Sequence, residues 1–176
     1  GHCGACNAGY RLMGTSCVGW AGSCANGKLA PQPKRKASNY CGKCNAGYYL
    51  VAASCVAWGG SCPNGQLSAQ TLRTKANQCG SCNAGYQLMA DRQCQAWGGQ
   101  CQNGALIMQS KRTQDNHCGS CLSGYRLVGK VCKAWAGVCT NGKLMPQSKR
   151  TQNNHCHSCN SMFFLSGTSC NAWTLC

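Results

Sequence analysis

The chain has 176 residues, of which 20 are Cys and 23 are Gly, and 17 Lys and Arg against two acidic residues give it a formal net charge of +15. Only two Phe and five Met are present, and the apolar fraction is largely Ala and Cys, which excludes one large apolar core. Cysteine at this density indicates a disulfide scaffold made in an oxidising compartment, so we expect a secreted, extracellular protein. No run of about 20 apolar residues occurs, and no membrane span is predicted.

The charge balance bears on function in two ways. The chain contains no Glu, its only acids are Asp91 and Asp115, and no His recurs at one position of every repeat. Acid–base catalysis by paired carboxylates is therefore excluded, and we predict no enzymatic activity, no catalytic residue, no cofactor and no metal. The excess of positive charge favours polyanions as partners.

A repeat of 38 residues, once 39, organises the chain from its start. The blocks read C-x2-C-x10-C-x6-C, with one extra residue in the third block near Asp91 and one fewer before the last cysteine of the fifth, and their first cysteines are at 3, 41, 79, 118 and 156. A Tyr recurs in the first four blocks, and a Leu and a Trp recur in all five. We therefore predict five repeats, the last four preceded by a connector: 1–24, 25–62, 63–101, 102–139 and 140–176.

The connectors that lead from one block to the next share a pattern of their own. Each carries Asn-Gly, then Leu, Gln, Arg and a second Asn, and the Asn-Gly dipeptide suits a tight turn with positive φ, as in a two-residue hairpin. Prolines and scattered glycines make helices unfavourable. We expect a small, disulfide-rich fold, mostly irregular with short β-strands, arranged as an elongated tandem-repeat rod of five cysteine-rich units.

The final block departs from the pattern. It replaces Gly-Tyr-x-Leu by Met-Phe-Phe-Leu, and Phe163 and Phe164 are candidates either for capping the array or for contacting another molecule during assembly. The chain begins with Gly1 and shows no signal peptide, so we interpret it as a mature or excised form whose leader has been removed.

Four cysteines per block allow three pairings within it. Pairing inside blocks uses all 20 cysteines, whereas pairing each fourth cysteine with the next first one leaves out Cys3 and Cys176. The motif C-x-x-C-x-x-G-Y-x-L-x4-C resembles the cysteine-rich repeats of tumour-necrosis-factor receptors and furin-like modules, and the connector C-x-N-G-x-L is similar to the segment that opens such receptor repeats. This resemblance implies an interlocked pairing of first with third and second with fourth cysteine: Cys3–Cys17, Cys6–Cys24, Cys41–Cys55, Cys44–Cys62, Cys79–Cys94, Cys82–Cys101, Cys118–Cys132, Cys121–Cys139, Cys156–Cys170 and Cys159–Cys176.

Zinc ligation by four thiolates per block is the alternative use of the C-x2-C pairs. The composition does not fit a cytosolic zinc protein, so disulfides are favoured. The histidines flank first cysteines in only some blocks and are interpreted as loop residues.

Two recurring features are candidates for binding. The tryptophans are interpreted as packing residues or as stacking platforms for sugar rings, and a third hypothesis stacks connector arginines on their faces: Trp20, Trp58, Trp97, Trp135 and Trp173. Connector cations form the candidate polyanion-binding stripe, since weak contacts multiply along a polymer: Lys34, Arg35, Lys36, Arg73, Lys75, Lys111, Arg112, Lys149 and Arg150.

The favoured function is a secreted structural repeat protein that self-associates into, or coats, an extracellular fibre or matrix. Its basic stripe would hold acidic polysaccharide or a neighbouring subunit. A carbohydrate-binding or ligand-binding, receptor-like ectodomain module is the alternative, and a cationic membrane-active defence protein is a third. Nucleic acid fits the charge but is disfavoured as a partner for a secreted disulfide protein.

Overall fold

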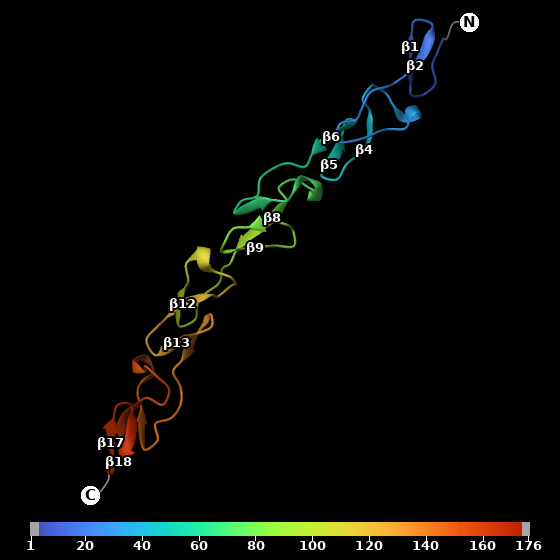
Figure 1. Ribbon diagram of the computed structural model, residues 1–176. Coiled ribbons are helices and arrows are strands. Elements are labelled where there is room, and N and C mark those ends of the chain that lie inside the picture. Colours follow the sequence, from blue (N-terminus) through green and yellow to red (C-terminus); the bar gives the residue numbers. More distant parts are fainter. Residues whose placement is uncertain (1–3, 174–176) are drawn as a thin grey trace. The chain divides into compact units, whose positions relative to one another are not determined.

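The computed structural model of the protein describes residues 4–173. The chain divides into two compact units, Gly1–Asn83 with Leu88–Gln95 and Ala84–Gln87 with Ala96–Cys176. Both are built from the same small parts: every sheet in the described range is a single pair of strands, and four short 3-10 turns lie between strands (Figure 1). The described residues contain no α-helix, which confirms the prediction of short strands, irregular segments and little helix.

The first kind of strand pair is the hairpin formed by the middle of each cysteine block. Its first strand starts at the recurring Tyr or Phe, and its second strand carries the third cysteine opposite the recurring Leu, as in Leu50↔Cys55. The hairpins are β1 (Tyr10–Met13) with β2 (Ser16–Gly19), β5 (Tyr48–Val51) with β6 (Ser54–Ala57), β9 (Tyr86–Leu88) with β10 (Cys94–Ala96), β13 (Tyr125–Val128) with β14 (Val131–Ala134), and β17 (Phe163–Ser166) with β18 (Ser169–Ala172).

The second kind joins a connector to the block that follows it. The connector strand begins at the Gly of Asn-Gly and pairs, with a bulge, to the strand that contains C-x2-C. These sheets and the 3-10 turns between their strands are β3 (Gly27–Leu29), η1 (Gln32–Lys34) and β4 (Cys41–Cys44); β7 (Gly65–Leu67), η2 (Gln70–Leu72) and β8 (Cys79–Cys82); β11 (Gly104–Leu106), η3 (Gln109–Lys111) and β12 (Cys118–Cys121); and β15 (Gly142–Leu144), η4 (Gln147–Lys149) and β16 (Cys156–Cys159).

The Asn-Gly dipeptide makes a turn, but not the two-residue hairpin expected of it. Asn26 takes the positive φ, 58°, and the Gly27 N–H closes the turn on the Cys24 carbonyl. Gly27 then starts β3, whose partner β4 comes only after the 3-10 turn. Positive φ at Asn recurs at the equivalent positions of the other three connectors, because Asn is one of the few residues with a side chain that tolerates this region.

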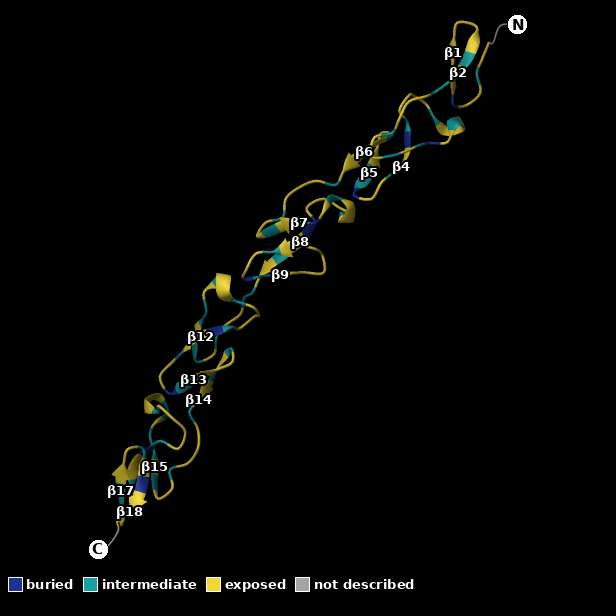
Figure 2. Ribbon diagram, viewed as in Figure 1, coloured by how far each residue is buried: buried dark blue, intermediate teal, exposed yellow. Residues whose placement is uncertain are grey.

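Burial is slight and is centred on sulfur. The buried apolar residues are Ala30 and five cysteines, four of which open a C-x2-C strand. Figure 2 shows these positions as short dark-blue stretches, as in β4, β8 and β12, between exposed or half-buried segments. Disulfides therefore take the place of an apolar core, as the composition predicts.

The disulfide pairing inferred from the receptor resemblance is wrong. The second cysteine of a block bonds the third, and the fourth bonds the first of the next block, so that consecutive repeats are covalently linked. Among residues 4–173 there are nine bonds: Cys6–Cys17, Cys24–Cys41, Cys44–Cys55, Cys62–Cys79, Cys82–Cys94, Cys101–Cys118, Cys121–Cys132, Cys139–Cys156 and Cys159–Cys170.

Sheet register explains this pairing. The connector strand lies against the C-x2-C strand with Leu29 opposite Cys41, which brings the Cα atom of Cys24 within 5.2 Å of that of Cys41. The hairpin then folds back so that the Cα atoms of Cys44 and Cys55 are 5.4 Å apart. Both separations suit a disulfide. Cys3 and Cys176, which the predicted Cys3–Cys17 and Cys159–Cys176 bonds involve, lie outside the described residues, but Cys17 and Cys159 have the other partners given above.

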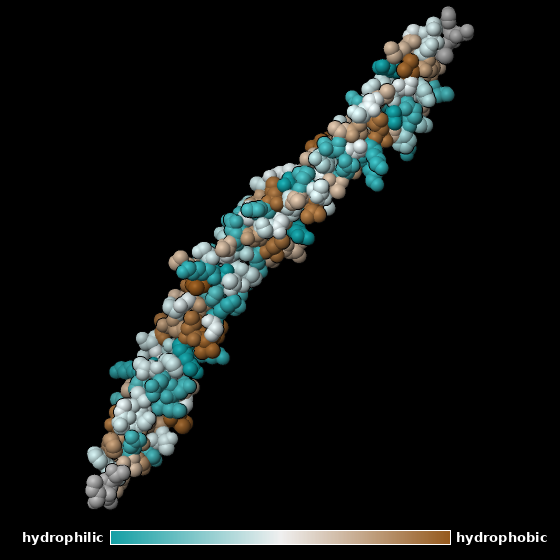
Figure 3. Space-filling view, viewed as in Figure 1, coloured by the Kyte–Doolittle hydropathy of each residue, from teal (hydrophilic) through white to brown (hydrophobic). Residues whose placement is uncertain are grey.

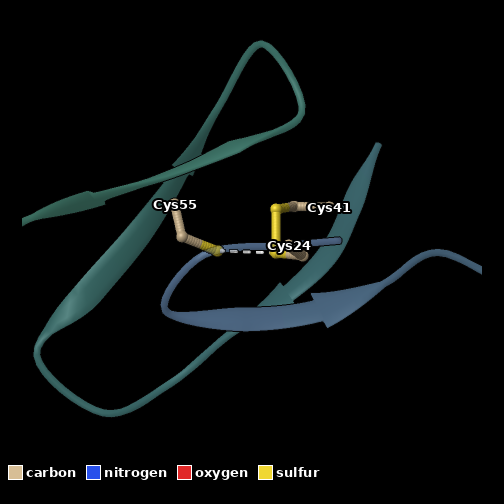
Figure 4. Close-up of side chains that lie close together, drawn as sticks. All are labelled: Cys24, Cys41 and Cys55. Carbon is tan, nitrogen blue, oxygen red and sulfur yellow. Dashed lines mark hydrogen bonds between the residues drawn. A yellow bond between two sulfur atoms is a disulfide. The ribbon is translucent and has the colours of Figure 1, made fainter. Parts of the chain in front are cut away.

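The two disulfides of a repeat lie against each other. In Figure 4 the Cys55 sulfur points at the Cys24–Cys41 bond, and the Sγ atoms of Cys24 and Cys55 are 3.8 Å apart. Because both sulfurs are in disulfides and carry no hydrogen, this is a van der Waals contact. The same triplet of sulfurs recurs three more times. Metal ligation by cysteine needs thiolates, and these sulfurs are all oxidised.

Candidate functional site

A hydrogen-bonded clamp fastens each connector to the hairpin before it. In the Trp58 repeat, the Gly47 carbonyl accepts the Trp58 N–H and also the Gln70 side-chain amide, at 2.9 and 2.5 Å. Arg73 donates Nε to the Ser68 carbonyl and a terminal nitrogen to the Trp58 carbonyl, at 2.7 and 3.0 Å. The guanidinium thus joins the connector backbone to the end of the preceding hairpin.

The clamp is the same at all four junctions. Gln32, Gln109 and Gln147 bind the carbonyls of Gly9, Gly85 and Gly124. Arg35, Arg112 and Arg150 bind the carbonyls of Trp20, Trp97 and Trp135. These four arginines, predicted as part of the polyanion-binding stripe, are half-buried and already hold backbone acceptors.

The second Asn of each connector completes the junction, a role that the sequence reasoning missed. Asn39 has a positive φ of 59°, donates its N–H to the Ala21 carbonyl and accepts the Ser23 N–H on Oδ1. Asn77, Asn116 and Asn154 make the equivalent contacts. The sequence signal was present, because Gln, Arg and this Asn hold the same spacing in all four connectors.

The connector lysines are the part of the predicted stripe that faces solvent. All five are exposed, namely Lys34, Lys36, Lys75, Lys111 and Lys149. Lys75 donates Nζ to the Asp91 carbonyl at 2.7 Å, whereas no hydrogen bond of the other four side chains is found within the described range. Lys34, Lys111 and Lys149 each end a 3-10 turn, and Leu72 holds that place in the second connector.

The tryptophans are mostly covered. Trp20, Trp58, Trp97 and Trp135 are half-buried, while Trp173 is 63% exposed. The residue after the recurring Tyr or Phe lies against the ring: Tyr49 stacks on Trp58 with centroids 4.0 Å apart, and Phe164 lies 4.6 Å from Trp173. The first four rings are therefore partly covered by packing while that of Trp173 is mostly exposed, and sugar stacking stays a prediction.

Cation–π contacts occur, but not from the connector arginines. Arg11 and Arg126, on the first strands of their hairpins, place Cζ 4.8 and 4.6 Å from the ring centroids of Trp20 and Trp135. The connector arginines instead donate to the backbone carbonyls of the tryptophans. The hypothesis of connector arginines stacked on the Trp faces is wrong.

Each hairpin also exposes apolar side chains. The recurring Leu is between 38% and 49% exposed in all five hairpins, at Leu12, Leu50, Leu88, Leu127 and Leu165. Figure 3 shows brown, hydrophobic patches between hydrophilic ones on the visible face. In the last hairpin the assembly candidates Phe163 and Phe164 are half-buried, and Met162 beside them is 74% exposed.

The fold and its junctions define a disulfide-rich tandem-repeat protein. No protein-family model matches the sequence, and no curated protein or solved structure is significantly similar to it. The resemblance to tumour-necrosis-factor-receptor and furin-like repeats is therefore supported only by the repeated cysteine-rich units with short strand pairs. Within the described part of the chain, no helix has the length and apolarity needed to cross a bilayer.

Proposed function

We propose that this protein is a secreted structural protein that forms or coats an extracellular fibre or matrix, and that its lysines hold acidic glycan or a neighbouring subunit. The observation that carries the proposal is the repetition of one junction, with the same disulfide, Gln, Arg and Asn contacts four times. Such repetition of one structural unit is typical of tandem-repeat proteins, in which each repeat contacts its neighbours. Its nine disulfides suit an oxidising environment.

The exposed hairpin leucines favour self-association. Five repeated apolar patches offer many weak contacts, and their combined strength exceeds that of any single one. The net charge of +15 opposes close approach of copies at low ionic strength. Salt screens this repulsion, whereas it weakens the bridging of copies by a polyanion.

Light scattering and electron microscopy of the disulfide-intact protein test the proposal. We expect concentration-dependent assembly that increases between about 0.05 and 0.5 M NaCl without polyanion, where screening lengths fall below about 10 Å. With a sulfated polysaccharide we expect assembly that dissolves over the same range. A protein that stays monomeric at high concentration under both conditions would overturn the proposal.

A glycan-binding module is the second candidate function. It is favoured by the groove beside Trp135, which combines aromatic, hydroxyl and cationic side chains. Glycan binding by a protein that never assembles would support this module instead of the scaffold.

A further inference from the structure

A groove lies at the fourth junction, between the fourth hairpin and the 3-10 turn η4. Its volume is about 420 Å³, and Tyr125 and Trp135 contribute to it from the hairpin. Ser148, Lys149 and Thr151 contribute from the connector. All of these residues belong to one compact unit, and the clamp between Arg150 and the Trp135 carbonyl holds the two sides together at 3.2 Å.

The walls of this groove suit an anionic sugar. Aromatic rings present an apolar surface to the C–H face of a pyranose, while the hydroxyls of Ser148 and Thr151 offer hydrogen bonds. Lys149 is exposed at the rim, and Arg126 lies over the Trp135 ring with Cζ 4.6 Å from its centroid. Lys149 thus lines the groove itself, whereas Arg126 is not a lining residue and reaches the site through its contact with the Trp135 ring.

Acidic side chains do little to neutralise these cations. The chain has only two acids, and both accept backbone N–H groups in other loops, Asp115 from Gly98 and Asp91 from Gln93. The groove therefore keeps an uncompensated positive field. Because the clamp fixes both walls before a ligand arrives, little ordering entropy opposes binding.

We propose that this groove binds one residue of an acidic polysaccharide, with the Tyr125 and Trp135 side chains that line the groove against the sugar and with Lys149 and Arg126 on its sulfate or carboxylate group. The inference rests on the glycan-holding part of the proposed function. The sulfated and the uronate sugar share the same chemistry here, a ring with an apolar face and a pendant anion. A sulfate, with its three terminal oxygens, gives the two cations more acceptors than a carboxylate does.

The chain contains its own comparison. At the second junction the clamp is the same, but Leu72 stands where Lys149 stands and Tyr49 stacks on the Trp58 ring where Arg126 covers Trp135. The first junction keeps both cations, as Arg11 and Lys34. Anionic sugar is therefore expected at the first and fourth junctions and not at the second.

Titration of the disulfide-intact protein, followed by calorimetry and by NMR of the indole N–H signals, tests this. The probes are chondroitin sulfate, hyaluronan and neutral chitin oligosaccharides of equal length. We expect chondroitin sulfate to shift the Trp20 and Trp135 signals and leave Trp58 unchanged, hyaluronan to do so more weakly, and the neutral oligosaccharide to have no effect.

The variant Arg126→Tyr/Lys149→Leu copies the second junction into the fourth. It should abolish the Trp135 shift and weaken binding at that site roughly tenfold or more, since charged hydrogen bonds are lost. The control Lys143→Leu/Lys133→Leu removes the same charge from exposed strand positions of the same unit and should leave the Trp135 shift intact. The proposal would be overturned if both variants lost the Trp135 shift equally. It would also be overturned if chondroitin sulfate shifted the Trp58 signal as much as that of Trp135.

The experiments distinguish a failure of the proposed glycan site from a failure of the proposed matrix function. Assembly in salt without an indole shift would support the matrix function and contradict the glycan site. Indole shifts in a protein that never assembles would support the glycan site and contradict the matrix function.

Discussion

In three of the four connectors a Lys and an Arg are adjacent in the sequence, and the two cations have different roles. Arg112 is half-buried, with Nε on the Ile107 carbonyl at 2.9 Å and a terminal nitrogen on both the Trp97 carbonyl and the Gln109 side chain. Lys111, its neighbour, is exposed. A guanidinium presents several donors in a fixed plane, which an ammonium cannot reproduce. This explains why the clamp position is Arg in all four connectors while its neighbour is Lys or Leu.

Arg112→Lys is therefore expected to destabilise the third junction by about 1–3 kcal/mol, because half-buried backbone acceptors lose their charged donors. Guanidinium unfolding with disulfides intact measures the free energy, and hydrogen exchange of the Trp97 amide locates the loss. Lys111→Ala is the matched control and should change stability by less than about 0.5 kcal/mol. Equal effects of the two substitutions would show that Arg112 is an ordinary surface cation.

Polar residues before the first cysteine support the connector in interchangeable ways. The Gln78 side-chain oxygen accepts the Thr74 N–H at 2.8 Å, while Nδ1 of His117 and of His155 accepts the N–H of Thr113 and Thr151 at 3.3 and 3.2 Å. An amide oxygen and an unprotonated imidazole nitrogen serve as equivalent acceptors here. His117 and His155, interpreted from sequence as loop residues, thus close a turn of the connector, whereas His157 lies in β16.

At the scale of the element, the hairpin depends on the Gly that precedes its first strand. Gly47 has a φ of 86°, and a Cβ atom there would overlap the Gln70 carbonyl group. Glycine is needed here for two reasons: the backbone has a positive φ, and the connector backbone approaches too closely to leave room for a side chain. In the last hairpin Met162 holds this position with a φ of 71°, and no clamp glutamine lies over it among the described residues.

Gly47→Ala is expected to cost about 2 kcal/mol or more, from the left-handed backbone and from displacement of the clamp. Gly59→Ala is the control, since no atom lies within 4 Å of its added Cβ and its φ is not positive. Thermal unfolding of both variants with disulfides intact checks this. The explanation fails if Gly47→Ala has the same melting temperature as Gly59→Ala and the unmodified protein.

The repeat, the strand-and-turn character and the positive φ of Asn26 follow from sequence, because each depends on local spacing or on one residue type. The pairing of sulfurs does not, since it depends on register. The Asn26-Gly27 turn was expected to close a local hairpin, whereas Gly27 starts a strand that pairs with residues 41–44. Likewise the four clamp arginines look like surface charge until their backbone partners are known, and the groove joins residues from two elements that only the fold brings together.

At the scale of the whole molecule, stability depends on covalent links more than on burial. The bonded cysteines are 11, 12 or 17 residues apart, and loops of this length are each worth about 3 kcal/mol in the loop-entropy model. The link from the fourth cysteine to the next first one also differs in kind from a link inside a block. It passes from one repeat to its neighbour, so that a force on the chain is carried by sulfur as well as by backbone.

Tryptic mapping without reduction tests this linkage directly, because Lys43 lies between Cys41 and Cys44 and is exposed. Cleavage at Lys36 and Lys43 releases the peptide 37–43, whose only cysteine is Cys41. The Cys24–Cys41 bond attaches this peptide to residues 12–28, whereas the pairing of first with third cysteine attaches it to residues 44–73. We expect mass spectrometry at acidic pH, where thiolate exchange is slow, to find residues 12–28 joined to 37–43 through Cys24–Cys41 and to residues 1–11 through Cys6–Cys17. Peptide 37–43 joined to 44–73 would mean that the repeats are closed units, and the covalent continuity proposed for a matrix protein would be lost.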